Sequence, residues 1–186
     1  MVIAERHLTL EEFLRLPEEE PALEYEDGEV TQKVSPKAKH SAMQGGLATF
    51  VNTFARRRKL ALAFPELRTT FAGRSVVPDV AIYRWERIQR TAEAGLVDDV
   101  TTPPDIAIEI VSPGQSTNSL VRRCLWYVDN GVSASVLLDP EDRSIVVFRP
   151  NANGQSVTGD ERLPFDDLLP GFELTANELF SVLTID

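Results

Sequence analysis

The sequence predicts an α/β domain in which a mixed central sheet is flanked by helices. Residues 104–113 contain a run of apolar, mostly β-branched residues that does not alternate with polar ones, which is typical of a central strand covered on both faces. Apolar residues at helical spacing in residues 35–59 and 119–129 predict the covering helices. The predicted core order is helix, strand, strand, strand, helix, strand, which fits a mixed sheet between helices.

Length and composition indicate one soluble domain. The chain has 186 residues, within the usual range of about 100–200 residues for a domain. We expect a single domain over residues 1–186, with an N-terminal helix and hairpin (1–34), a core (35–149) and a C-terminal covering segment (150–186). Cys124 is the only cysteine, the N-terminus lacks a signal-peptide pattern, and no apolar run is long enough to cross a bilayer. We therefore expect a cytoplasmic protein without membrane association.

The charge balance argues against tight, sequence-independent binding to a polyanion. The chain has 29 acidic and 19 basic residues and a net charge of −10. Such a charge disfavours nonspecific association with nucleic acid. It does not exclude a metal-dependent nuclease, because the site of such an enzyme concentrates carboxylates.

The N-terminal part begins with a short amphipathic helix over residues 9–16, with Thr9 as its N-cap. Residues 23–30 then predict two short strands around Asp27-Gly28, a favoured pair for a tight hairpin turn. Glu24 lies on the first of these strands. A glutamate on an edge hairpin is usually solvated, so we expect Glu24 to be exposed.

A long helix is predicted over residues 35–59, with Ser35 as its N-cap and Pro36 in its first turn. The basic cluster at 56–59 suits the negative end of the helix dipole. His40 lies one turn into the helix, where a lone histidine is usually solvated. The apolar stripe of this helix consists of Met43, Leu47, Phe50, Val51 and Phe54.

Two strands are predicted between this helix and the central strand. Residues 60–71 read as one strand bent at Pro65, and it leads through 72–74 into a strand at 76–83 that contains Asp79. The polar residues 83–102 predict a surface excursion with one helical turn.

After the central strand we expect a helix at 119–129 and then a hairpin of strands at 132–140 and 144–149, which makes five main strands. Residues 150–160 read as an Asn/Gly-rich loop. The apolar residues from 163 to 174 are expected to cover a sheet edge before a last helix that starts at Thr175.

Two acids in apolar strands are the strongest functional signal. Glu109 lies in the central strand and Asp79 in similar apolar surroundings. A buried carboxylate loses hydration worth several kcal/mol unless a cation, a hydrogen-bond donor or a metal ion compensates it. A structural ion pair is one explanation. Two such acids on neighbouring strands also suit Mg²⁺, which takes oxygen ligands and activates water for phosphodiester hydrolysis.

An ordered series of short motifs resembles one nuclease family over nearly the whole chain. The series consists of Glu24-Tyr-Glu-Asp-Gly-Glu29, Ser35-Pro36, His40, Pro78-Asp79, Pro104-Asp-Ile-Ala-Ile-Glu-Ile-Val-Ser-Pro113, Tyr127-x-x-x-Gly-Val132 and Leu138-Asp-Pro140. It resembles the PD-(D/E)XK nuclease superfamily and, more closely, its Uma-two family of restriction-type endonucleases. The resemblance implies a restriction-endonuclease-like core with an N-terminal hairpin extension.

The resemblance also implies a function and a site. The activity would be metal-dependent endonucleolytic cleavage of DNA, with Mg²⁺ as cofactor, Mn²⁺ as its substitute, and a homodimer as the working form. Asp79 and Glu109 would be metal ligands, the backbone carbonyl of Ile110 would add a third, and Glu24 and His40 would line the same site.

The chain departs from the superfamily pattern at the lysine. That lysine would stand two residues after Glu109, where this chain has Val111, and in the Uma-two family it is placed on the following helix, where this chain has Arg123. Arginine keeps the charge and can clamp a phosphate, but it cannot act as a general base. Four residues before Arg123, Ser119 replaces an aspartate common in the family.

Two further readings therefore stand beside the endonuclease. The chain could be a catalytically degenerate member that serves as a nucleic-acid-binding or oligomeric accessory protein. Alternatively, the acids could form a buried polar network in a purely structural domain.

Overall fold

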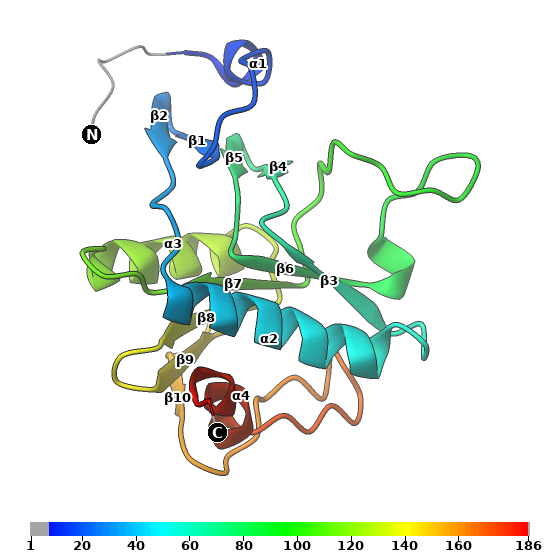
Figure 1. The fold of residues 1–186 in the computed structure, drawn as a ribbon. Coiled ribbons are helices and arrows are strands. Elements are labelled where there is room, and N and C mark those ends of the chain that lie inside the picture. The colour runs from blue at the N-terminus through cyan, green and yellow to red at the C-terminus, as the bar shows by residue number, and fades with distance from the viewer. Residues whose placement is uncertain (1–7, 186) are drawn as a thin grey trace.

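The computed structural model describes residues 8–185 and contains two sheets (Figure 1). The large sheet consists, in spatial order, of β10 (Gln155–Val157), β9 (Ser144–Phe148), β8 (Ala134–Asp139), β7 (Ile106–Ile110), β6 (Val80–Arg84) and β3 (Ala61–Pro65). Only β7 and β8 are parallel, so the sheet is mixed, as predicted. All five residues of β7 are buried, which confirms the central strand.

The predicted hairpin at 23–30 is confirmed, but it belongs to a small sheet that was not predicted. Its order is β2 (Glu29–Gln32), β1 (Leu23–Glu26), β5 (Arg74–Val76) and β4 (Thr69–Phe71). The prediction of five main strands was wrong, because the large sheet contains a sixth strand, β10, and because two expected strands are each divided between the sheets. The segment 60–71 forms β3 and β4, and the segment 76–83 ends β5 and then starts β6 at Val80.

The pairing of β6 with β7 places the two strand acids side by side. In this antiparallel pair Val80 lies opposite Ile108 and Ala81 opposite Ala107. Continued by one residue, the register sets Asp79 opposite Glu109, on the same side of the sheet. Glu109 points away from the face of Ile108, because successive side chains of a strand alternate between faces.

Helices cover both faces of the large sheet (Figure 1). The residues Met43, Leu47 and Val51 of α2 (Ala38–Ala55) pack on the face that carries Ile106 and Ile108. On the other face, Leu120, Cys124 and Val128 of α3 (Thr117–Asp129) pack against Leu137 and Phe148.

Among the described residues, no helix is both long and apolar enough to span a bilayer.

The ends of the helices differ in part from the prediction. α2 starts at Ala38 after Lys37, whose side chain makes no capping hydrogen bond, so Ser35 is not the N-cap. α3 starts two residues earlier than expected because the Ser116 side chain accepts a hydrogen bond from the backbone N–H of Ser119. The short helix α1 (Leu10–Phe13) starts after its predicted N-cap, Thr9, and α4 (Ala176–Phe180) starts after Thr175, where the last helix was expected to begin; each cap is part of a capping box.

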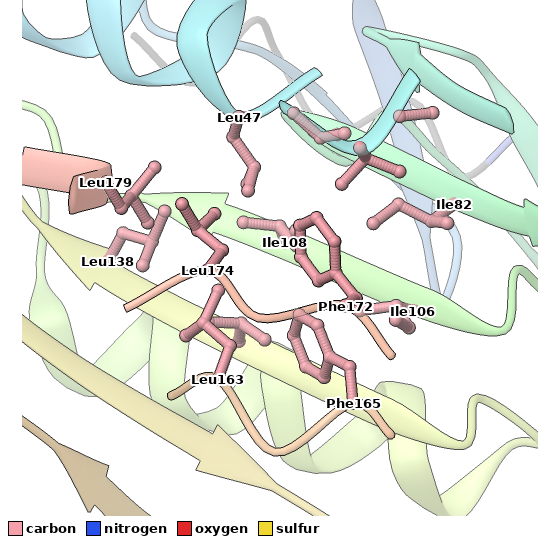
Figure 2. Close-up of a cluster of buried hydrophobic side chains, with 14 of the residues drawn as sticks. Leu47, Ile82, Ile106, Ile108, Leu138, Leu163, Phe165, Phe172, Leu174 and Leu179 are labelled. Atoms are coloured by element: carbon pink, nitrogen blue, oxygen red, sulfur yellow. The ribbon is translucent and has the colours of Figure 1, made fainter. Parts of the chain in front are cut away.

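The C-terminal segment covers a face of the large sheet and not an edge. Leu163, Phe165, Phe172 and Leu174 lie beside Leu47 of α2 and over Ile106 and Ile108 of the sheet (Figure 2). α2 is too narrow to cover this face alone, so the chain needs the extra apolar segment. The loop expected at 150–160 also contains a strand, β10. The single turn η1 (Trp85–Arg87) lies in the predicted excursion, and η2 (Ser181–Leu183) follows α4.

Candidate active site

A cavity of about 500 Å³ lies between the small sheet, α3 and the first turns of α2. Glu24, His40, Asp79, Glu109 and Arg123, the five side chains named from the sequence, all line it. The expectation that Glu24 and His40 are solvated was wrong, because they are only 3% and 6% exposed. Glu24 is part of the small sheet and His40 of α2, and the enclosure of both side chains in this cavity was not foreseen.

Asp79 is held by three donors from different parts of the chain. Its Oδ1 accepts a hydrogen bond from Lys33 Nζ at 2.7 Å. Its Oδ2 lies 3.1 Å from His40 Nε2 and accepts the backbone N–H of Ile110 at 2.7 Å. Burial disfavours the charged carboxylate, but the hydrogen bond from His40 and the charge of Lys33 outweigh burial and hold the pKa of Asp79 below its usual value. Asp79 is therefore a buried carboxylate that stays ionised.

Glu109 has fewer partners. Its Oε1 accepts a hydrogen bond from the hydroxyl of Tyr127 at 2.7 Å and lies 3.7 Å from Arg123 Nη1. Burial raises the pKa of Glu109 to about 7, the charge of Arg123 opposes this, and the negative charge of Asp79 adds to it. The two neighbouring carboxylates thus differ in environment, and Glu109 is the less compensated of the two.

Arg123 joins the helix α3 to the small sheet. Its guanidinium donates to both oxygens of Glu24, at 3.0 and 2.7 Å, and to Glu26 Oε1 at 2.5 Å. Glu24 Oε1 also accepts the backbone N–H of Val77 at 2.7 Å. Burial disfavours the charge of Arg123, but Glu24 and Glu109 outweigh it and raise its pKa. Arg123 is thus enclosed in the site, and its exposed neighbour Arg122 also lines the cavity.

Sequence reasoning missed two residues of this site. Lys33 Nζ, which contacts Asp79, also donates to the backbone carbonyl of Val77 at 2.8 Å, and its side chain is only 11% exposed. Tyr127 was quoted as part of a motif, and its role as a donor to Glu109 was not foreseen. Nothing near Lys33 in the sequence distinguishes it from a surface lysine. Tyr127, in contrast, belongs to one of the quoted motifs, and this could have indicated that it is part of the site.

The two carboxylates leave oxygen lone pairs free for an ion. Glu109 Oε2 accepts no hydrogen bond from residues 8–185, and Asp79 Oδ1 accepts one, from Lys33. Within that described range, no group of three or more His, Cys, Asp or Glu side chains converges as a metal cage. The donor set therefore fits a hard cation that keeps several waters, as Mg²⁺ does, and does not fit an ion bound wholly by side chains. Ile110 contributes its backbone N–H here, and the role of its carbonyl stays a prediction.

Comparison with known proteins identifies the family of the chain. The model of the Uma2 family, described as "Putative restriction endonuclease", matches residues 10–177. The chain belongs to the Uma2 family. A crystal structure described as a "putative nuclease belonging to DUF820" from Anabaena variabilis ATCC 29413 is 35% identical, with a TM-score of 0.91, and the match covers 95% of this chain and 99% of the other. No curated protein matched the chain.

The Uma2 match confirms the fold expected from the motifs. The chain has the restriction-endonuclease-like α/β fold, with the mixed large sheet between α2 and α3. The family and the solved structure both support a nuclease function.

Proposed function

We propose that this Uma2 protein is a metal-dependent endonuclease that hydrolyses phosphodiester bonds in DNA. The observation that carries the proposal is the pair of buried carboxylates, Asp79 and Glu109, which extend from adjacent strands into one cavity that also contains cationic side chains. A phosphodiester is an anion that must be bound and then stabilised as charge develops on its oxygens, so it requires cations at the reacting centre.

The two acids would bind one metal ion together. Glu109 Oε2 and Asp79 Oδ1 are the oxygens that would hold Mg²⁺, with Mn²⁺ as a substitute, and the Ile110 carbonyl is the proposed third ligand. When bound, the ion lowers the pKa of a coordinated water and offsets charge on the phosphoryl oxygens. Asp79 is oriented by His40 and by the Ile110 N–H, so its position does not depend on the ion.

Arg123 and Glu24 form another part of the wall of the cavity. The fork of Arg123 is fixed by Glu24 and Glu26, which leaves its Nη1 at 3.7 Å from Glu109. We infer that Arg123 compensates the charge of Glu109 and contacts the phosphate through N–H groups that Glu24 and Glu26 do not use. Arginine is always protonated, so proton abstraction is not among its roles.

One observation favours the degenerate accessory protein as a second candidate. Lys33 and Arg123 each contact a carboxylate in the structure, so these two cations of the cavity are already paired. A protein of this kind would bind nucleic acid without cutting it.

The test is cleavage of supercoiled plasmid with Mg²⁺ or Mn²⁺ by wild type, Asp79→Asn and the control Asp98→Asn, an exposed aspartate outside the cavity. Metal-dependent nicking by wild type and by Asp98→Asn, with a loss of at least about 100-fold in Asp79→Asn, supports the endonuclease. If wild type binds DNA but does not cleave it with either metal, the result supports the accessory protein. The proposed homodimer is tested by sedimentation of wild type in the presence of a double-stranded DNA substrate.

A further inference from the structure

We propose that Lys33 is the catalytic lysine of this site, and that its ammonium contacts the attacking water or a phosphoryl oxygen. The lysine then comes from the segment between β2 and α2, and not from the strand of Glu109 or from α3. This inference rests on the nuclease function proposed above and assigns a residue that the motif series left out.

The position of Lys33 is fixed by backbone and side-chain contacts. Its backbone N–H donates to the carbonyl of Ala22 at 2.9 Å, which extends the pairing of β1 and β2. Its Nζ lies 2.7 Å from Asp79 Oδ1 and 2.8 Å from the carbonyl of Val77. An ammonium has three N–H donors, and the third has no acceptor among residues 8–185. Because Lys33 lines the cavity, that donor is available to a substrate.

The two positions where the superfamily pattern places a lysine do not hold a free ammonium. Val111 is aliphatic and packs with Leu120 and Cys124 of α3. Arg123 carries a guanidinium in place of an ammonium, and three of its N–H groups already donate to Glu24 and Glu26. Lys33 is the lysine that contacts a proposed metal ligand, Asp79.

The chemistry requires a cation at this point. In hydrolysis the water oxygen forms a bond to phosphorus and releases a proton to solvent, one ester P–O bond breaks, and the leaving oxygen keeps the electron pair and takes up a proton from solvent. Negative charge grows on the phosphoryl oxygens as this happens. An ammonium fixed beside Asp79 stabilises that charge without further reorganisation, because Asp79 and Val77 already hold it in place.

A purely structural role for Lys33 makes different predictions. A lysine that only neutralised Asp79 would, when replaced, lower the melting temperature and leave the turnover of the folded protein unchanged. A catalytic lysine changes kcat in protein that is folded and binds metal, with little change in KM. A small amine in solution should also restore part of the activity of an alanine variant, because it replaces the missing ammonium.

The experiment compares Lys33→Met, Lys33→Ala and Lys33→Arg with the control Lys37→Met, an exposed lysine four residues away. It measures plasmid cleavage with Mn²⁺, Mn²⁺ binding by calorimetry and melting temperature. We expect Lys33→Met to lose about 10²–10⁴-fold in kcat while it still binds Mn²⁺, and Lys37→Met to stay within about threefold of wild type. Ethylammonium should raise the activity of Lys33→Ala by at least about tenfold and leave that of Lys37→Met unchanged.

Several results would overturn the proposal. Cleavage by Lys33→Met at a rate within about threefold of that of wild type would overturn the catalytic role of Lys33. It would leave the proposed nuclease function unaffected. If Lys33→Met does not fold, Lys33→Arg decides, since it keeps the ion pair with Asp79: a loss of at least about tenfold supports the proposal and wild-type cleavage overturns it. If wild type does not cut DNA with either metal, both the nuclease function and the role of Lys33 are overturned. This result differs from the case in which wild type and Lys33→Met both cut DNA, so the two failures can be distinguished.

Discussion

Replacement of Glu109 by glutamine should stabilise the protein at alkaline pH while it removes a proposed metal ligand. Burial raises the pKa of Glu109 from its ordinary 4.5 to about 7. The folded protein therefore binds this proton more tightly than the unfolded chain does. The contribution to stability is full below pH 4.5 and is lost as the pH rises through about 7. At about 1.4 kcal/mol per pKa unit, the difference between 4.5 and about 7 corresponds to roughly 3 kcal/mol.

Glutamine keeps the neutral form at every pH. Its amide oxygen can still accept the Tyr127 hydroxyl, which donates to Glu109 at 2.7 Å, and Arg123 keeps its two other carboxylate partners. We expect Glu109→Gln to match wild type near pH 4.5 and to exceed its unfolding free energy at pH 8.5 by up to about 3 kcal/mol.

The assay is urea denaturation at pH 4.5 and pH 8.5 with a chelator present, so that no divalent ion contributes. Addition of Mg²⁺ at pH 8.5 should then raise the melting temperature of wild type and not that of Glu109→Gln, since a ligand stabilises only the state that binds it. A Glu109→Gln protein less stable than wild type at pH 8.5 without metal would refute this reasoning. That result would show that Glu109 belongs to a well-compensated structural ion network.

Two further substitutions test the walls of the site and the packing of α2. Arg123→Met should lower the unfolding free energy at pH 7 by about 3–5 kcal/mol, because it leaves the buried Glu24 carboxylate without its guanidinium partner. A loss below about 1 kcal/mol in urea denaturation would show that this ion pair contributes little to stability. Gly46→Ala should cost about 1–3 kcal/mol, because a Cβ there would lie 2.7 Å from Val182 Cγ1. Gly45→Ala, with nothing within 4 Å of its Cβ, should instead stabilise the helix by about 0.5–1 kcal/mol, and equal effects of the two in thermal melts would contradict the packing.

Local patterns predicted those parts of the fold that short-range chemistry determines. The Asp27-Gly28 turn has positive φ at both residues, 52° and 94°, and it pairs Glu26 with Glu29 as a two-residue hairpin requires. The strand around Glu109 was predictable because its apolar residues are contiguous. The neighbouring position of Asp79 followed because its strand precedes that of Glu109 and pairs with it.

Contacts between distant segments were not predictable in this way. Glu24 is buried because β1 pairs with β5, through the single residue pair Tyr25 and Ser75, and neither strand's periodicity indicates its partner. Lys33 reaches Asp79 across 46 positions of the chain. A lysine in a polar stretch gives no local sign that its side chain is enclosed, so this part of the site required the structure.

Binding of Mn²⁺ in the absence of DNA measures most directly what the paired carboxylates do. Calorimetry of wild type and of the double variant Asp79→Asn/Glu109→Gln, both shown to be folded by circular dichroism, compares two proteins that differ only at the proposed donors. One ion bound per wild-type chain, and none per double-variant chain, is the predicted result. Equal binding by the two proteins, or no binding by wild type, would contradict a metal site at Asp79 and Glu109.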